Sequence, residues 1–203
     1  AHMRIKIERT DNTQLSVLSA GAGFKAGKIK ITDGNGASQI LDLSGTGVTT
    51  VGDVLNKLNS AGLAISARVN DTGDGILITQ TAGTLTASIQ DADPSVQTAE
   101  SLGIAGTFSG NQLNGSLEKS ISIVAGDTLS QIATKINDAN AGVSASIIND
   151  GSGTNPYRLA ISSKNSGAAG RLVFDGSAIG LQTTSLVQGQ DAVLSALGSR
   201  SLR

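Results

Sequence analysis

Thr128–Gly153 reads TLSQIATKINDANAGVSASIINDGSG, and this stretch decides how the rest of the chain is interpreted. From Leu129 to Ile136 the apolar residues recur three and four positions apart, which is the spacing of one helix face. The stretch opens with a capping-box pattern, a threonine followed three positions later by a glutamine. From Val143 to Ile147, apolar residues alternate with serines, as in a half-buried strand. The stretch therefore predicts a short amphipathic helix followed by a strand.

The same pattern occurs a second time, earlier in the chain. Thr50–Gly75 reads TVGDVLNKLNSAGLAISARVNDTGDG and aligns with Thr128–Gly153 without a gap. Eight of the 26 aligned pairs are identical, and five more exchange one aliphatic residue for another. The matches fall on the helix face, on the strand and on the glycines of the following turn. We therefore interpret the two stretches as copies of one module.

Strands are predicted on both sides of each helix, so each copy has the order β–α–β–β–β with antiparallel pairing. The fold class is α+β and β-rich, with two similar modules of antiparallel strands, each packed with a short amphipathic helix. The predicted strands are Lys28–Thr32, Gln39–Leu43, Ile65–Val69, Ile76–Thr79 and Thr84–Gln90 in the first copy, and Ser120–Val124, Val143–Ile147, Leu159–Ser162 and Arg171–Phe174 in the second.

Four segments are expected along the chain. Residues 1–27 combine Ala1-His2-Met3, interpreted as a remnant of a cloning tag to be excluded from fold reasoning, with a lead-in segment. Residues 28–108 form the first module, 109–190 the second, and 191–203 an exit segment toward a missing C-terminal region. The smaller elements expected within these segments are a strand at Arg4–Glu8, a brief helix at Thr13–Leu18 that ends at Gly21, a short helix within Thr98–Gly106 that ends at Gly103, and a link at Thr107–Gly115.

Composition excludes several classes of function. The chain has 203 residues, a net charge of −1 and no cysteine, and its one histidine is His2. A near-neutral chain lacks the basic face that nucleic-acid binding needs. Without cysteine, and with histidine confined to the presumed tag, thiol and Ser–His catalysis and imidazole metal sites are excluded. No apolar stretch is long enough to span a membrane. We expect no enzyme, no cofactor, no nucleic acid and no membrane insertion.

Aspartates and glycines cluster in several loops and raise the question of calcium. Asp71-Thr72-Gly73-Asp74-Gly75 superficially resembles an Asp/Gly calcium loop, but it lacks the spacing and the terminal glutamate of an EF-hand. Asp, Asn and Gly are also the residues that tight turns require, and we favour that interpretation. The other residues considered as calcium ligands are Asp91, Asp93, Asn149, Asp150 and Asn155.

Two further patterns are weighed against ordinary loops. Gly21-Ala22-Gly23 and Gly45-Thr46-Gly47 contain the start of a dinucleotide-binding pattern but lack a preceding buried strand and a third glycine, so we interpret both as loops. Carboxylate pairs of the kind used in glycoside hydrolysis depend on spatial separation. They are disfavoured because aromatic residues, which commonly form sugar platforms, make up only 2% of the chain.

Several of these residues resemble the flagellin IN motif, which takes its name from an Ile-Asn pair. The resemblance lies in Asp127-Thr128-Leu129, in Lys135-Ile136-Asn137, in Gly142-Val143-Ser144-Ala145 and in Tyr157-Arg158-Leu159. Lys57-Leu58-Asn59 is the variant in the first copy. Gly189-Gln190-Asp191-Ala192 resembles a segment that follows this motif in the flagellar filament-capping proteins, the hook-associated protein 2 family.

The resemblance implies a non-enzymatic structural component of the bacterial flagellum. Capping proteins form a ring-like oligomer at the distal tip and guide the insertion of flagellin, so the implied partners are flagellin and other copies of the protein. It also implies export through the flagellar secretion channel without a signal peptide, an extracellular location, and helical, coiled-coil flanks beyond this outer-domain fragment. The motif residues are then Lys57, Leu58, Asn59, Lys135, Ile136, Asn137, Asp191 and Ala192.

Two alternatives stay open. The first alternative is the variable outer domain of a flagellin or of a hook–filament junction protein, because some of these proteins share the motif. A surface adhesin module that binds host glycans is the alternative from another class. Tyr157 and Arg158, at the predicted tip of the longer turn, are the candidate interaction loop, although the simpler interpretation is an edge-covering tyrosine and a solvated arginine.

Overall fold

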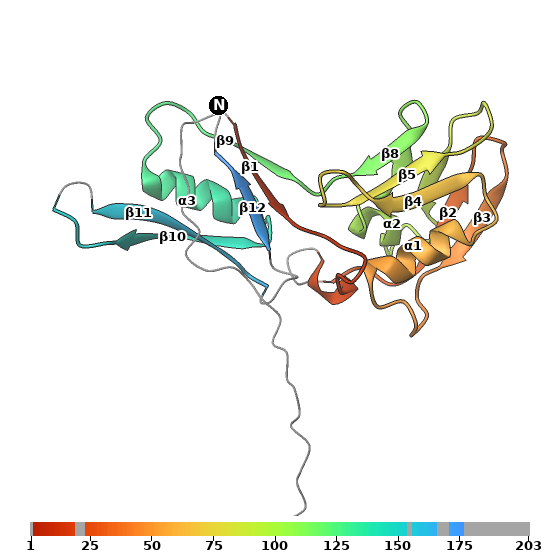
Figure 1. The fold of residues 1–203 in the computed structure, drawn as a ribbon, viewed down its shortest axis with the longest axis horizontal. Helices are drawn as coiled ribbons and strands as arrows, with labels where there is room; N and C mark the ends of the chain where they lie inside the picture. Colours follow the sequence, from red (N-terminus) through yellow and green to blue (C-terminus); the bar gives the residue numbers. More distant parts are fainter. Residues whose placement is uncertain (1, 19–22, 154–155, 166–170, 177–203) are drawn as a thin grey trace, which may run out of the picture.

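The computed structural model describes residues 2–18, 23–153, 156–165 and 171–176. Two lobes lie side by side, and we name each after its helix (Figure 1). The α1 lobe contains η1 (Leu15–Val17), β2 (Lys28–Thr32), β3 (Ser38–Asp42), α1 (Val51–Asn59), β4 (Ile65–Val69), β5 (Ile76–Gln80), β6 (Ser88–Asp91), α2 (Thr98–Ser101), β7 (Gly106–Thr107) and β8 (Gln112–Gly115). The α3 lobe contains β1 (His2–Ile7), β9 (Lys119–Ser122), α3 (Leu129–Asp138), β10 (Val143–Asn149), β11 (Tyr157–Ser163) and β12 (Leu172–Asp175).

The α1 lobe is built from two antiparallel sheets, with strand orders β3-β2-β6-β7 and β4-β5-β8. Helix α1 lays its apolar stripe on these sheets, and the hydrophobic core forms between them. The fully buried large side chains of this core are Leu15, Ile29, Ile31, Leu43, Val54, Leu58, Ile78, Ile89 and Ile104.

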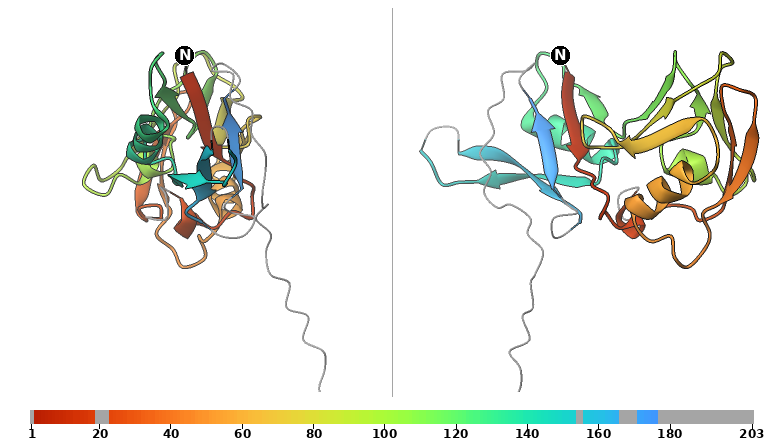
Figure 2. Two further views of the ribbon diagram at one scale, coloured as in Figure 1. Left: turned by 90° about the vertical axis from the view of Figure 1, so that its left-hand side faces the viewer. Right: turned by 45° about the vertical axis from the view of Figure 1, so that its right-hand side comes forward.

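The α3 lobe combines the sheet β12-β1-β9 with helix α3 and the hairpin β10-β11. The hairpin extends away from the α1 lobe in both Figure 1 and the right-hand view of Figure 2. The chain leaves this lobe after β1, builds the whole α1 lobe, and returns as β9 to pair with β1. The α1 lobe is therefore an insertion between two neighbouring strands of the α3 lobe.

Both predicted helices are confirmed, together with their caps. The Thr50 hydroxyl accepts a hydrogen bond from the Asp53 N–H at 3.2 Å, and the Asp53 carboxylate accepts one from the Thr50 N–H at 2.8 Å. Thr128 and Gln131 make the reciprocal pair at 3.3 and 2.8 Å. Each capping box satisfies two N–H groups at the first turn, which explains why both helices start where they do.

The further strand predicted after each hairpin is present, as β6 and β12, but it does not pair with that hairpin. β6 pairs with β2 and β7, and β12 pairs with β1, so neither strand extends the sheet of the hairpin before it. In the α1 lobe, β6 leaves the hairpin because of the turn after β5. In this turn Gly83 has φ +95° and lies against the backbone of Gly34. This turn sends the chain across to β2, where Ile89 pairs with Ile31 in the core.

The segment expected to link the copies contains a strand. Gln112–Gly115 forms β8 and pairs with β5 in the register Ile78↔Leu113. The alternation of apolar residues that would indicate a strand is missing because Leu113 is the one large apolar residue in it. The β-rich, antiparallel character of the fold is confirmed, while the division of the chain at residues 27, 108 and 190 stays a prediction.

The N-terminal residues also take part in the fold. His2 and Met3 belong to β1, and Met3 is completely buried in the α3 lobe, so excluding them from fold reasoning was wrong. The brief helix expected at Thr13–Leu18 is a single 3₁₀ turn at Leu15–Val17, and the glycine expected to end it, Gly21, lies outside the described residues. The short helix α2 ends before Gly103, which has φ +72°, as predicted. Every helix in the described segments is too short or too polar to cross a membrane.

Candidate functional site

The Ile-Asn pair at the end of α3 joins this helix to strand β10. Ile136 is completely buried in the α3 lobe core. The Asn137 side-chain amide donates from Nδ2 to the Ala145 carbonyl at 2.9 Å, and its Oδ1 accepts from the Ala145 N–H at 2.8 Å. One side chain therefore satisfies both backbone groups of a strand residue, in the way a neighbouring strand would.

The Leu-Asn pair at the end of α1 makes the same connection in the other lobe. Leu58 is completely buried. Asn59 Nδ2 donates to the Ala67 carbonyl at 2.9 Å, and Asn59 Oδ1 accepts from the Ala67 N–H at 2.8 Å. We call each of these arrangements an Asn clamp. Only an uncharged amide offers a donor and an acceptor at this reach, so aspartate cannot replace it without losing the donor.

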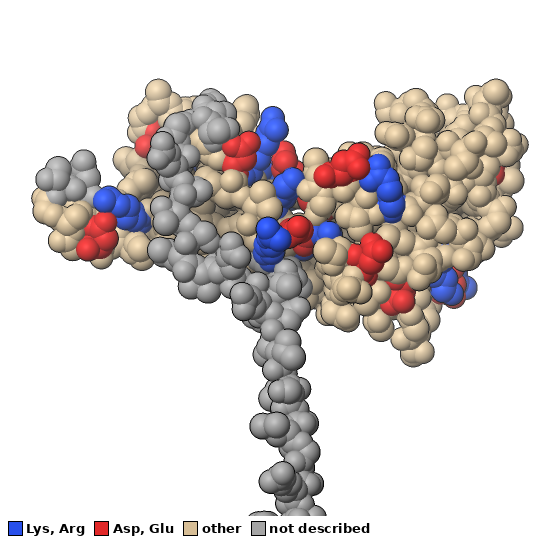
Figure 3. All heavy atoms as spheres, viewed as in Figure 1, with Lys and Arg blue, Asp and Glu red and all other residues tan. Residues whose placement is uncertain are grey.

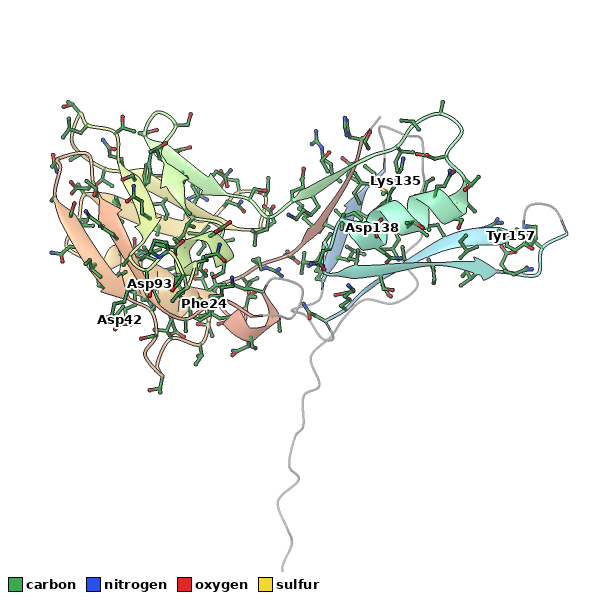
Figure 4. All side chains as sticks on the ribbon, turned by 180° about the vertical axis from the view of Figure 1, so that it is seen from behind. Phe24, Asp42, Asp93, Lys135, Asp138 and Tyr157 are labelled. Atoms are coloured by element: carbon green, nitrogen blue, oxygen red, sulfur yellow. The ribbon has the colours of Figure 1, made fainter. Side chains whose placement is uncertain are left out.

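The lysines that precede the two pairs lie in different surroundings. Lys135 Nζ lies 2.6 Å from Asp127 Oδ2 and donates to the Ser122 carbonyl at 3.2 Å, which ties α3 to the end of β9. The bond from Lys135, with a second from the Val124 N–H, lowers the pKa of Asp127. Lys57 is exposed on α1, so the two lysines do not share a role. Lys135 and Asp138 are both marked on α3 in Figure 4.

Tyr157 lies at the far end of the hairpin from the Asn137 clamp (Figure 4), and Arg158 is next to it in β11. The Tyr157 side chain is 59% exposed, and Arg158 Nη2 lies 3.0 Å from Asp150 Oδ2. The structure therefore does not bring the candidate interaction loop together with Lys135, Ile136 and Asn137. Asp191 and Ala192 lie outside the described residues.

The Asp71–Gly75 loop forms a tight turn, which is the interpretation favoured from the sequence. It also buries the carboxylate of Asp74, and nothing in the sequence indicated that burial. Asp74 is 1% exposed and accepts hydrogen bonds from Thr72, from Asn70 Nδ2 at 3.0 Å and from Ser116 Oγ at 2.5 Å. Burial raises the pKa of Asp74, but these hydrogen bonds outweigh it and hold the pKa below its ordinary value. Across the described residues, no group of three or more His, Cys, Asp or Glu side chains is arranged to hold a metal ion.

The same turn connects the two lobes. The Arg9 N–H donates to the Gly73 carbonyl at 2.6 Å, and Lys6 Nζ donates to the Thr72 carbonyl at 2.8 Å. Arg9 is 7% exposed; burial lowers the pKa of its guanidinium, and the charge of Asp74 opposes this. On the face shown in Figure 3, charged side chains gather where the lobes meet, and the outer part of the α1 lobe is largely uncharged.

A second buried carboxylate, Asp33, holds the β2–β3 turn. It is 2% exposed and accepts from the N–H groups of Ala64, Asn35 and Ala37, the first of which belongs to the segment leading into β4. These bonds lower its pKa, that from Ala64 most. Its place in a predicted hairpin turn was the only sequence signal for this role.

A hollow with a volume of about 410 Å³ lies beside the first turn of α1. Its carboxylates include Asp53, whose pKa is lowered to about 2 by hydrogen bonds from Thr49 and Thr50. This carboxylate is occupied in capping the helix. The hollow is therefore lined by a group that supports the fold and stays ionised, which is a poor arrangement for proton transfer near neutral pH.

Comparison with known proteins agrees with the motif. Residues 107–165 match the family model described as the flagellin hook IN motif, a region that runs from β7 through β8, β9, α3 and β10 to β11. Neither the curated proteins nor the solved structures gave a match to this chain. The matched motif supports a structural role in the flagellum, an extracellular filament location, and assembly contacts with flagellin or with other copies. Residues 107–165 thus carry a flagellin hook IN motif, which supports a flagellin-related protein.

Proposed function

We propose that the chain is a non-enzymatic outer part of the distal filament cap of the bacterial flagellum and promotes flagellin assembly through protein–protein contacts. The observation that carries the proposal is the IN-motif match at residues 107–165, together with the Asn137 clamp that the motif builds. The resemblance of Gly189-Gln190-Asp191-Ala192 to the segment that follows the motif in capping proteins favours the cap over other flagellar proteins.

The proposal includes two copies of the module, one in each lobe. The two Asn clamps have the same donors, acceptors and distances, and the two capping boxes are equivalent. The sheets also correspond in part, because β3-β2-β6 and β9-β1-β12 are both antiparallel, with the strand before the helix and the strand after the hairpin on opposite sides of the central strand. The α1 lobe adds β7 beyond β6. A duplicated module held together by backbone hydrogen bonds suits a structural part that works through its surface.

The lobes support contact functions in preference to catalysis. The buried carboxylates Asp33 and Asp74 are engaged by backbone or hydroxyl donors, and the pKa of each lies below its ordinary value. A general acid or base working near neutral pH would need the opposite shift. Both groups instead hold turns in place, which favours a scaffold.

The deciding experiment is deletion of the full-length gene, followed by inspection of filaments and of the culture medium. If the chain belongs to the cap, we expect the deletion to give short or absent filaments and monomeric flagellin in the medium. Flagellin would still be exported but would not be retained at the tip of the filament. Loss of filaments with no flagellin in the medium would instead identify a flagellin. Filaments of normal length would overturn the proposal.

The adhesin alternative is favoured only by the exposed ring of Tyr157 at the end of the hairpin. A glycan array separates it from the cap. Binding that is lost in Tyr157→Ala but kept in a matched exposed variant, Val124→Ala, would support the adhesin, whereas no binding above background would count against it. Val124 suits this comparison because it is 58% exposed.

A further inference from the structure

Two stretches of chain cross between the lobes. Residues 8–14 run from β1 to η1, and residues 116–118 run from β8 to β9 (Figure 1). In the described part of the chain, the buried apolar residues form one cluster in each lobe, and no residue belongs to both. Lobes without a shared apolar core are expected to move relative to each other, so a fixed angle here depends on polar contacts. One such contact, from Asn165 Nδ2 to the Val17 carbonyl at 3.2 Å, joins the lobes at a single point and can act as a pivot.

A larger set of polar contacts comes from the Asn70–Gly75 turn of the α1 lobe, which binds the first crossing. The Gly73 carbonyl accepts a hydrogen bond from the Arg9 N–H at 2.6 Å. The Thr72 carbonyl accepts one from Lys6 Nζ at 2.8 Å. Lys6 belongs to β1, so the turn is bonded to the central strand of the α3 lobe sheet as well as to the chain that leaves it.

The same turn binds the second crossing through its side chains. The Asp74 carboxylate accepts a hydrogen bond at 2.5 Å from the hydroxyl of Ser116, the first residue of that crossing. Just before the crossing, Asn114 Oδ1 in β8 accepts a hydrogen bond from Asn70 Nδ2 at 2.9 Å. Asp74 also interacts by charge with Arg9, which lies in the first crossing. One carboxylate therefore acts on both crossings.

The side chains of the turn that make these contacts are shielded from water. Asp74 and Asn70 are 1% and 5% exposed. Hydrogen bonds to an ionised group are stronger than those between neutral groups, and burial strengthens them further. Separation of the lobes at this point would take the Ser116 hydroxyl away from the Asp74 carboxylate and would take Arg9 away from the turn. The arrangement in which the turn is bound to both crossings is therefore strongly preferred.

The second copy of the module has different residues at these positions. In the alignment of the two copies, Ile148 takes the place of Asn70, and Ser152 takes the place of Asp74. Ile148 is 43% exposed, Ser152 is also exposed, and both lie toward the end of the hairpin that extends away from the α1 lobe (Figure 1). A hairpin of this module therefore does not require a buried Asn–Asp pair. The pair occurs in the copy whose turn meets the crossings, which indicates a role at the junction of the lobes.

We propose that the Asn70–Gly75 turn is a latch that fixes the angle between the two lobes. Asp74 and Asn70 hold the second crossing, and the backbone of the turn holds the first. When the latch is broken, the lobes keep their own folds and rotate relative to each other about residues 8–14 and 116–118. The comparison of the two copies rests on the module duplication proposed above, whereas the contacts themselves do not, and neither depends on the cap role.

The test measures the distance between the two helices in spin-labelled protein. The chain has no cysteine of its own, so labels can be attached at Asn56→Cys and Thr134→Cys, which are exposed and correspond to each other in the two copies. Pulsed electron paramagnetic resonance then gives the distribution of distances between the labels. Asp74→Ser introduces the residue of the second copy. Asp71→Ser is its matched control, because Asp71 is an exposed residue of the same turn that pairs with Arg68 in the same lobe.

A second latch variant leaves the turn itself unchanged. Lys6→Met with Ser116→Ala removes two side chains that bond the turn from outside it. Lys119→Met with Ser120→Ala, the same two exchanges at exposed positions of β9, is the matched control. Two-dimensional amide NMR spectra of every variant show whether each lobe is folded.

We expect one narrow distance distribution in the labelled parent and in both controls. In both latch variants the distribution should be at least about twofold wider while the lobes stay folded, because the lobes then sample a range of angles. If Asp74→Ser unfolds the α1 lobe, the Lys6→Met with Ser116→Ala variant decides.

An unchanged width in that double variant would overturn the proposal, and so would a broad distribution in the parent. Loss of the α1 lobe fold in both latch variants would also overturn it, because the contacts would then serve the stability of that lobe. The measurement needs only the purified chain, whereas the gene-deletion phenotype tests the cap role, so the two proposals fail separately.

Discussion

At the residue scale, the Ile-Asn pair divides two tasks between neighbours. Ile136 fills the core, and Asn137 bonds the backbone of a strand that follows α3 in the chain. The burial of Ile136 could be predicted from the helical spacing of apolar residues. The partner of Asn137 could not be predicted in this way. Ala145 bonds through its backbone N–H and carbonyl, and every residue except proline carries both groups.

Removing either Asn clamp should weaken its own lobe. Asn137→Ala leaves the Ala145 N–H and carbonyl without their partner, so we expect a loss of about 1–2 kcal/mol in the free energy of unfolding. Asn59→Ala should cost the α1 lobe a similar amount. Asn56→Ala, the same exchange at an exposed position of α1, is the control for helix propensity. Urea unfolding followed by far-UV circular dichroism measures all three, and equal stability of Asn137→Ala and Asn56→Ala would contradict the role of the clamp.

Asp74 should make stability depend on acid pH. Its pKa in the folded protein lies below its ordinary value of 3.8, so the ionised form is favoured by folding. The stability that it contributes is therefore present above the unfolded pKa and is lost as the pH falls through the folded pKa. Asp74→Asn should lower the free energy of unfolding by about 2 kcal/mol near pH 7. The new side-chain NH₂ group would face the groups of Thr72, Asn70 and Ser116 that donate to the carboxylate.

The difference in stability between Asp74→Asn and the parent protein should shrink as the pH falls below about 4, where the carboxyl of the unfolded chain becomes protonated. Chemical unfolding at several pH values measures this difference. Asp71→Asn is the matched control, because Asp71 is exposed and pairs with Arg68. A difference that stays constant down to pH 3 would show that the Asp74 charge does not contribute.

At the scale of elements, helices and hairpins could be predicted because their signals are local. Apolar spacing, capping residues and turn glycines lie within the stretch that they organise, and α1, α3 and both hairpins are confirmed. The partners of β6, β8 and β12 could not be predicted, because pairing there depends on where a turn sends the chain. Gly83, with its backbone against Gly34, decides one such direction by a contact between residues far apart in the sequence.

The pairing of β8 with β5 can be tested at a single glycine. A Cβ on Gly115 would lie 2.6 Å from the Gly103 carbonyl oxygen and 3.0 Å from the Ile76 carbonyl oxygen, so backbone must shift. We expect Gly115→Ala to destabilise the α1 lobe by about 1–3 kcal/mol. Gly45→Ala, where a Cβ meets nothing within 4 Å, should be neutral or slightly stabilising. Thermal unfolding compares the two, and equal effects would mean that β8 does not pack closely on β5.

At the scale of the whole molecule, the insertion of one lobe into the other makes their stabilities unequal. β1 ends at Ile7 and its neighbour β9 begins at Lys119, so more than half of the chain separates two adjacent strands of one sheet. When the α1 lobe is folded, it brings these ends together. When it is unfolded, the α3 lobe must close a flexible loop of that length, which costs about 4 kcal/mol in chain entropy before any constant term. A small domain has only about 5–15 kcal/mol of stability to lose.

Matched substitutions in the two central strands should therefore have different effects. Ile5 in β1 and Ile31 in β2 are both completely buried, and each lies in a strand that has partners on both sides. Ile5→Asp should unfold the α3 lobe and leave the α1 lobe folded, because the α1 lobe has its own core and its ends need not meet. Ile31→Asp should unfold the α1 lobe. It should also destabilise or unfold the α3 lobe, because the unfolded chain between β1 and β9 then becomes a long flexible loop that the α3 lobe must close. Two-dimensional amide NMR spectra separate the lobes by their assigned signals, and a folded α3 lobe of unchanged stability in Ile31→Asp would show that its sheet does not depend on the lobe inserted into it.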